Sequence, residues 1–120
     1  MEKIIQILIG VVAAEHLCFL WLEMFAWETK GKKVFNTLKP ELFTPTRVLA
    51  ANQGLYNGFL SAGLIWSFFI TDKAWSTNVA VFFLACVIIA GIYGAITATK
   101  KIFFIQGLPA LIALVVVVMK

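Results

Sequence analysis

The sequence predicts an all-α integral membrane protein, folded as an antiparallel up-and-down bundle of four transmembrane helices. Of its 120 residues, 62% are hydrophobic and 13% are charged, and the mean hydropathy is +0.95. This composition is too apolar for a small water-soluble domain. A bilayer core takes about 20 residues of helix, and four apolar segments that can supply them occupy most of the chain: residues 4–27, 46–70, 74–99 and 102–119. Because these spans use most of the chain, no separate soluble domain remains, and residues 1–120 are expected to form one transmembrane domain.

The first segment is expected to remain in the protein as a span. Lys3 and the apolar residues that follow it resemble a signal peptide, with Val12 to Ala14 as a candidate cleavage site. The apolar run, however, continues to Trp27, whereas the apolar region of a signal peptide ends after about 7–15 residues. Retention is therefore the better interpretation.

Helix-start signals separate the other segments. Thr44 followed by Pro45 is typical of an N-cap with proline at the first helical position, so the second helix is expected to begin there. Asp72 is expected to cap the third helix. Only two lysines separate the third and fourth segments, and such short connections make successive helices antiparallel. Pro109 is expected to kink the fourth helix or to loosen it locally.

The cations are distributed unevenly between the two ends of the spans. Seven lie in the connections after the first and third segments: Lys30, Lys32, Lys33, Lys39, Arg47, Lys100 and Lys101. Three lie at the opposite ends: Lys3, Lys73 and Lys120. The positive-inside rule therefore predicts that both connections are cytoplasmic and that both termini are extracytoplasmic. The net charge of +4 indicates membrane lipids with anionic head groups as partners rather than nucleic acid, because no nucleic-acid motif is present.

Three ionisable residues interrupt the first apolar segment: Glu15, His16 and Glu23. A charge at the bilayer centre costs about 2.5–3.5 kcal/mol on insertion scales, so these side chains are expected to face protein, water or one another. At 3.6 residues per turn, His16 and Glu23 lie within about 20° of each other, and Glu15 lies about 100° from His16. The three groups therefore share one wedge of the helix, where they can exchange a proton.

Polar residues in the other segments extend this pattern. Gln53, Asn57 and Ser61 recur every four residues beside Asn52, and the third and fourth segments contribute Tyr93 and Gln106. Because a helix rises about 1.5 Å per residue, one polar residue of each segment lies roughly 6–9 Å inside the cytoplasmic boundary. The sequence thus predicts a pocket open to the cytoplasm. Its ligand-binding or proton-exchange residues are expected to be Glu15, His16, Glu23, Asn52, Gln53, Asn57, Tyr93 and Gln106.

Metal and enzyme motifs are missing from the sequence. One histidine with two carboxylates lacks the second histidine of the usual facial triad, and no CxxC is present, so no metal is expected. Cys18 and Cys86 lie at mid-span, where they act as small apolar side chains. No nucleophile elbow, Walker loop or dinucleotide fingerprint occurs. Catalytic residues and cofactors therefore remain unassigned.

Small residues recur at helical spacing on two segments and allow helices to approach closely. The principal ones are Gly54, Gly58, Ala90 and Gly94. They indicate either packing within one subunit or a homo-oligomer that assembles through these faces, and the sequence leaves both open.

Four stretches carry a resemblance to a known family: EHLCFLWLEMFAW, LAANQGLYNGFLSAGLIW, CVIIAGIYGA and QGLPALIAL. With them the chain resembles small bacterial membrane proteins of unknown function, the domain-of-unknown-function family thirteen-oh-four. The resemblance covers nearly the whole chain. It implies a four-span fold and a multi-pass location in the bacterial inner (plasma) membrane, and it assigns a catalytic role to no residue.

Three classes of function fit the polar spans. In the first, the pocket has a binding or a transport role: it holds a small polar molecule, a cation or a lipid head group, and its acids would supply proton coupling if the ligand is transported. In the second, the glutamates and the histidine act as general acid and base on a lipid-soluble substrate. In the third, the polar residues only hold the helices of an accessory or assembly subunit together, at about 0.6 kcal/mol per contact.

Overall fold

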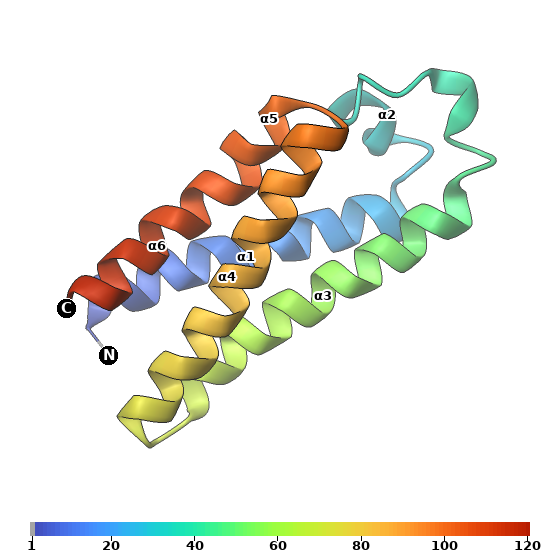
Figure 1. Ribbon diagram of the computed structural model, residues 1–120. Helices are drawn as coiled ribbons and strands as arrows, with labels where there is room; N and C mark the ends of the chain where they lie inside the picture. Colours follow the sequence, from blue (N-terminus) through green and yellow to red (C-terminus); the bar gives the residue numbers. More distant parts are fainter. Residues whose placement is uncertain (1) are drawn as a thin grey trace. The chain divides into compact units, whose positions relative to one another are not determined.

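The computed structural model describes residues 2–120, and this range is helical without a strand. The long helices are α1 (Lys3–Phe25), α3 (Arg47–Phe69) and α4 (Lys73–Thr97), and the last segment consists of α5 (Lys100–Ile102), η2 (Phe103–Gly107) and α6 (Leu108–Met119). Two short helices, α2 (Lys30–Val34) and η1 (Pro40–Leu42), lie between α1 and α3. Figure 1 shows this order of elements along the chain. The predicted all-α class is confirmed.

Three of these stretches are long and apolar enough to cross a membrane: Lys3–Phe25, Lys73–Thr97 and Lys100–Met119. Helix α3 has 23 residues, as many as α1, but it is not among the three. Its amides Asn52, Gln53 and Asn57 lower its hydropathy relative to the other helices. The fourth span therefore stays a prediction.

The chain divides into two compact units. The first consists of Met1–Glu15 and Leu60–Lys120, and the second of His16–Phe59. Helices α1 and α3 each contribute one part to both units.

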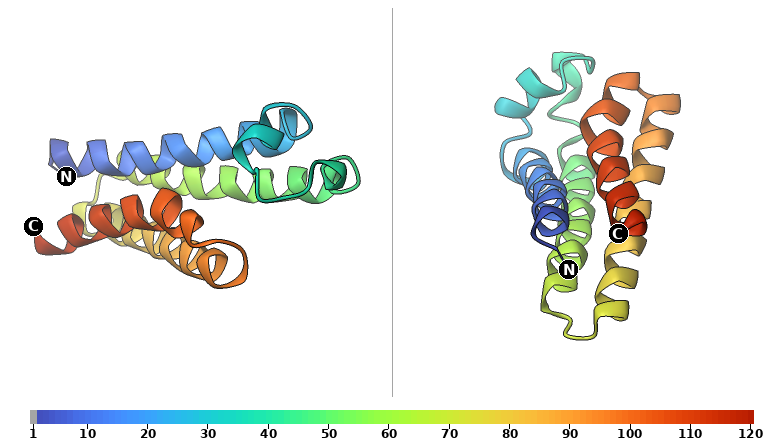
Figure 2. Two further views of the ribbon diagram at one scale, coloured as in Figure 1. Left: turned by 90° about the horizontal axis from the view of Figure 1, so that it is seen from above. Right: turned by 90° about the vertical axis from the view of Figure 1, so that its left-hand side faces the viewer.

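The first unit has an apolar core to which α1, α3, α4 and α6 all contribute. The fully or almost fully buried members are Ile5, Ile9, Val12, Ala13, Leu64, Ala80, Leu84, Val87, Ala110, Ala113 and Val117. Helices α4 and α6 lie side by side and antiparallel (Figures 1 and 2). Lys120 Nζ accordingly donates to Thr77 Oγ1 at 3.1 Å, near the start of α4.

Polar contacts fix the turn between α3 and α4. The Asp72 carboxylate accepts a hydrogen bond from the Trp75 backbone N–H at 3.0 Å, so the predicted cap of α4 is confirmed. Ser76 Oγ donates to the Ser67 carbonyl at 2.6 Å, and both serines are buried. Capping and this second bond satisfy backbone groups that the short turn would otherwise leave unpaired.

The last segment departs from α-helical geometry just before its proline. Phe103–Gly107 forms a π-helical turn, in which the Leu108 N–H donates to the Phe103 carbonyl, five residues back. In a regular α-helix, Pro109 would lack an N–H for the carbonyl four residues before it, and its ring would clash with that carbonyl. The wider π turn accommodates this defect. The local loosening expected at Pro109 is therefore present.

Ser61 provides a test of hydrogen bonding within the first unit. Its buried Oγ donates to the Ala13 carbonyl of α1 at 2.8 Å. We expect Ser61→Ala to lower the free energy of unfolding by about 0.6 kcal/mol, as is typical of contacts between helices in lipid. Thr97→Ala is the matched control, because the Thr97 hydroxyl donates to the Tyr93 carbonyl of its own helix and not across to another helix in residues 2–120. Chemical unfolding in detergent, followed by circular dichroism, compares the two; equal losses would contradict the prediction.

Candidate functional site

A buried hydrogen bond joins α1 to α3 in the second unit. Asn57 Nδ2 donates to Glu23 Oε1 at 2.6 Å, and the two residues are only 8% and 9% exposed. The structure thus brings together a carboxyl and an amide that the sequence placed on different spans. A buried carboxylate needs a proton or a positive partner to offset its lost hydration, and a neutral amide supplies only part of that.

Helix periodicity explains why these residues meet. On α3 the buried positions Ala50, Gly54, Asn57 and Ser61 recur at intervals of three and four residues, which lines one face of a helix. On α1, His16 lies seven residues before Glu23 and therefore on nearly the same face of the helix. His16 is fully buried, and its ring lies edge-on to Phe19 with centroids 5.3 Å apart.

The predicted amides Asn52 and Gln53 lie outside this buried face. Both are exposed, and Asn52 Nδ2 donates to the Val48 carbonyl of its own helix at 2.9 Å. The predicted four-residue stripe turns by about 40° at each step, because four residues span more than one turn. It therefore rotates by about 80° from Gln53 to Ser61, and only its later members, Asn57 and Ser61, face inward.

The remaining predicted site residues belong to the first unit. Glu15 is partly buried, and among the residues the structure describes, its Oε1 is a buried oxygen without a hydrogen-bond partner. Tyr93 is 68% exposed on α4, and Gln106 is partly buried in the π turn. Their participation in a site with Glu23 stays a prediction. Across residues 2–120, no group of three or more His, Cys, Asp or Glu side chains gathers in a way that could hold a metal ion.

Gly54 allows α1 and α3 to approach closely beside Glu23. A Cβ atom at Gly54 would lie 2.7 Å from Met24 Cγ, 3.0 Å from Glu23 Cβ and 3.1 Å from the Leu20 carbonyl oxygen. Gly58 also faces α1, where a Cβ would meet Leu20 Cδ1 at 2.6 Å. These two glycines therefore pack within the chain, and assembly of copies through Ala90 or other small residues stays a prediction.

We expect Gly54→Ala to lower the free energy of unfolding by about 1–3 kcal/mol, as overpacking does. The backbone oxygen of Leu20 cannot move without shifting α1, so the helices must separate and stretch the Glu23–Asn57 bond. Gly58→Ala is the control, because the obstructing atom there is the flexible end of a side chain. Unfolding in detergent measures both changes. A smaller loss for Gly54→Ala than for Gly58→Ala would refute the explanation.

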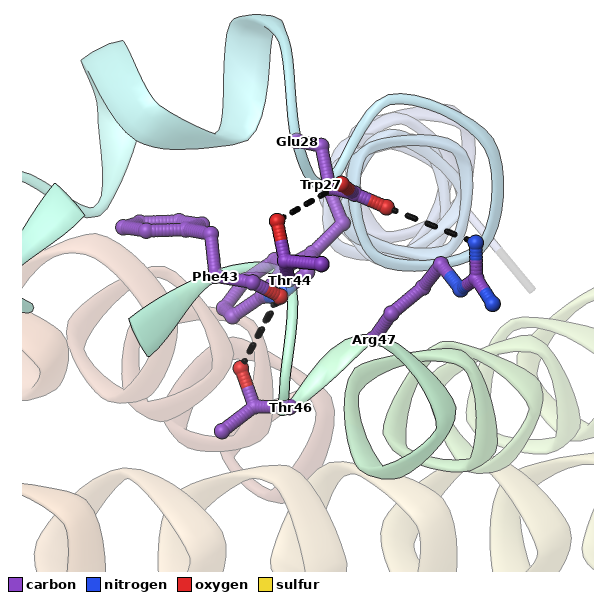
Figure 3. A network of polar contacts seen from close by, with 6 residues as sticks. All are labelled: Trp27, Glu28, Phe43, Thr44, Thr46 and Arg47. Atoms are coloured by element: carbon purple, nitrogen blue, oxygen red, sulfur yellow. Dashed lines mark hydrogen bonds and ion pairs between the residues drawn. The ribbon is translucent and has the colours of Figure 1, made fainter. Parts of the chain in front are cut away.

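The connection between α1 and α3 forms a fixed structure that the sequence did not reveal. The Trp27 ring lies 4.7 Å from that of Phe43, which is fully buried, and 5.3 Å from that of Phe35. Trp27 Nε1 donates to Thr46 Oγ1 at 3.1 Å, which ties the two ends of the connection together. Figure 3 shows Trp27, Phe43 and Thr46 in this arrangement. The presence of two phenylalanines, Phe35 and Phe43, in an otherwise lysine-rich connection could have indicated that it packs against itself.

Glu28 links this connection to the start of α3. Its Oε2 accepts from Thr44 Oγ1 at 2.9 Å, and its Oε1 lies 3.7 Å from Arg47 Nη1 (Figure 3). The prediction that the helix begins at Thr44 and Pro45 is wrong, since α3 begins at Arg47. The reason is that the Thr44 hydroxyl bonds to Glu28 from a turn, instead of accepting a backbone N–H as an N-cap.

A shallow groove of about 340 Å³ lies along the first two turns of α3. Its lining residues are Met24, Arg47, Val48, Ala51, Asn52 and Leu55. Most of this lining is apolar, with a guanidinium and an amide as its polar groups. Neither Glu23 nor Asn57 lines it, although Met24 follows Glu23 directly in α1.

Comparison with known proteins gives a family for this chain but no activity. Residues 10–118 match the family described as "Protein of unknown function (DUF1304)". The uncharacterized protein YpaA of Lactococcus lactis subsp. lactis (strain IL1403) is 36% identical over 107 residues, which cover 88% of each chain. No solved structure matches the chain significantly.

Proposed function

The chain belongs to the DUF1304 family of proteins of unknown function, and on that premise we propose a four-span membrane protein that binds a small polar ligand between its helices. Helix lengths support the four spans, because 23 residues of α3 extend about 34 Å, enough to cross a hydrocarbon core. The lysine-rich connections favour a cytoplasmic position for the segment between α1 and α3. Both termini then lie on the outer side of a bacterial plasma membrane.

The Glu23–Asn57 pair is the observation that carries this proposal. A glutamate enclosed between two helices is costly in lipid, and such residues usually mark ion or substrate pathways. Glu23 is enclosed in this way, and the amide of Asn57 that donates to it is neutral. A proton or a small cation can complete its charge balance. We therefore favour binding of a cation, or of a small molecule carrying a positive group, in exchange for a proton.

His16 extends the proposed site along α1. His16 lies on the same helix face as Glu23, two turns before it, and is fully buried. Both groups can pass protons, which would couple binding to proton movement and make transport a further step. Other ligands of this site, a neutral polar molecule or a lipid head group, would have to donate a hydrogen bond to Glu23.

The competing proposal is a structural role, in which the polar residues only hold the helices together. The Asn57–Glu23 bond joins separate helices, as polar contacts in an accessory or assembly subunit would. A carboxyl group is not needed for that purpose, however, because a second amide would accept the same bond without the desolvation cost of a charge.

Infrared difference spectroscopy of the protein in liposomes tests the proposal. Sodium, potassium or ethylammonium chloride is added at constant pH, and the C=O band of protonated carboxyl groups is followed. We expect one of these cations to reduce the band saturably, because it displaces a proton from a buried carboxyl group. A spectrum that none of the three cations changes would argue against proton-coupled cation binding and favour the structural role.

A further inference from the structure

Arg47 combines a cationic group with an apolar groove at the end of a long helix. Its side chain is 68% exposed, and it is the first residue of α3. Its ion pair with Glu28 joins Nη1 to a carboxylate oxygen over 3.7 Å, which is longer than a hydrogen bond. An exposed pair of this kind is weak. A guanidinium has five N–H donors in a planar fork that fits phosphate oxygens.

The groove leads from Arg47 along the apolar side of α3. Val48, Ala51 and Leu55 follow one another along it, with Met24 of α1 opposite. From Arg47 to Leu55 the helix rises about 12 Å. Val48 and Leu55 are 67% and 40% exposed, so this apolar surface is open to an acyl chain. One end of the groove therefore suits a phosphate, and the rest, apart from the Asn52 amide that donates to the Val48 carbonyl, suits hydrocarbon.

Charge complementarity identifies the occupant. The segment from Glu28 to Arg47 has five cations, Lys30, Lys32, Lys33, Lys39 and Arg47, against two carboxylates. Basic residues next to a membrane span attract anionic lipids. We propose that the groove binds one anionic phospholipid, with its phosphate on Arg47 and the start of an acyl chain along Val48, Ala51 and Leu55. This site is separate from Glu23 and Asn57, and it does not depend on the function proposed for them.

Lipid titration with native mass spectrometry tests the site in the full-length protein, purified in a mild detergent. Phosphatidylglycerol is compared with phosphatidylcholine of the same acyl chains. We expect Arg47→Gln to weaken phosphatidylglycerol binding about tenfold, the scale of one charge-assisted contact. Lys39→Gln is the matched control, because it removes the same charge from the same segment outside the groove. It should change the affinity by less than about twofold.

A second variant tests the apolar part of the groove. Leu55→Trp fills it and leaves Arg47 in place, so the affinity for both lipids is expected to fall. Equal losses for Arg47→Gln and Lys39→Gln would show diffuse attraction and overturn the site, as would equal binding of the two lipids by the unaltered protein. If Arg47→Gln does not fold, as judged by its circular dichroism, Arg47→Lys replaces it. Unchanged affinity in both Arg47→Lys and Leu55→Trp would also overturn the proposal.

Discussion

Replacing Glu23 by glutamine is expected to weaken the binding of small cations strongly while α1 and α3 remain joined. The glutamine carbonyl can still accept the hydrogen bond from Asn57 Nδ2, so the free energy of unfolding should change by less than about 1 kcal/mol. The variant has neither a negative charge nor a proton to exchange. Loss of a charge-assisted contact should weaken cation binding by at least about tenfold. Isothermal titration in detergent measures this affinity.

Glu41→Gln is the control for Glu23→Gln. Glu41 is exposed in η1, and its replacement makes the same change in net charge away from the buried pair. It should bind cations as the unaltered protein does. Normal cation binding by Glu23→Gln would place the ligand elsewhere. If Glu23→Gln changed only the free energy of unfolding, the structural role of the pair would be favoured.

Gly91→Ala is expected to lower the free energy of unfolding by about 1–3 kcal/mol, the usual range for overpacking. A Cβ atom at Gly91 would lie 2.9 Å from Gly107 Cα and 3.0 Å from Gly107 N. These are backbone atoms of the π turn, so no side-chain rotation can relieve the clash. Helix α4 would have to move away from η2. Chemical unfolding in detergent measures the loss.

Gly10→Ala provides the comparison for Gly91→Ala. A Cβ atom at Gly10 would meet nothing within 4 Å, and alanine is the better helix former by about 0.8–1 kcal/mol. This substitution should leave the free energy of unfolding unchanged or raise it. Equal destabilisation by both substitutions would mean that the close approach of Gly91 to Gly107 is not the cause.

Local signals in the sequence predicted much of the secondary structure. The cap of α4 could be predicted because Asp72 and the N–H that it accepts, that of Trp75, are only three residues apart in the sequence. Long apolar runs likewise give long helices, since their length and composition are visible in the chain. The start of α3 was not predictable in this way, because Thr44 bonds to Glu28, 16 residues earlier. The packing of Phe43 on Trp27 is non-local for the same reason.

The candidate site could be predicted only in part. The charged residues of α1 and Asn57 stood out because ionisable and amide groups are rare and costly in apolar segments. Which amide faces inward depends on its angular position around the helix axis. Residues four apart do not share that position, because each step of four turns by about 40°. Gln53 and Asn57 therefore look equivalent in the sequence, yet only Asn57 is buried. The groove beside Arg47 is lined by residues of both α1 and α3, so no short stretch of the sequence could indicate it.

The separation of Glu23 from Asn57 along the chain has a consequence for biosynthesis. The donor follows the acceptor by 34 residues. At about 5–20 residues per second, a ribosome adds these residues in roughly 2–7 s. During that interval the Glu23 carboxyl has been made but its amide donor has not. The bond that joins α1 to α3 therefore forms only after synthesis has reached Asn57, well inside α3.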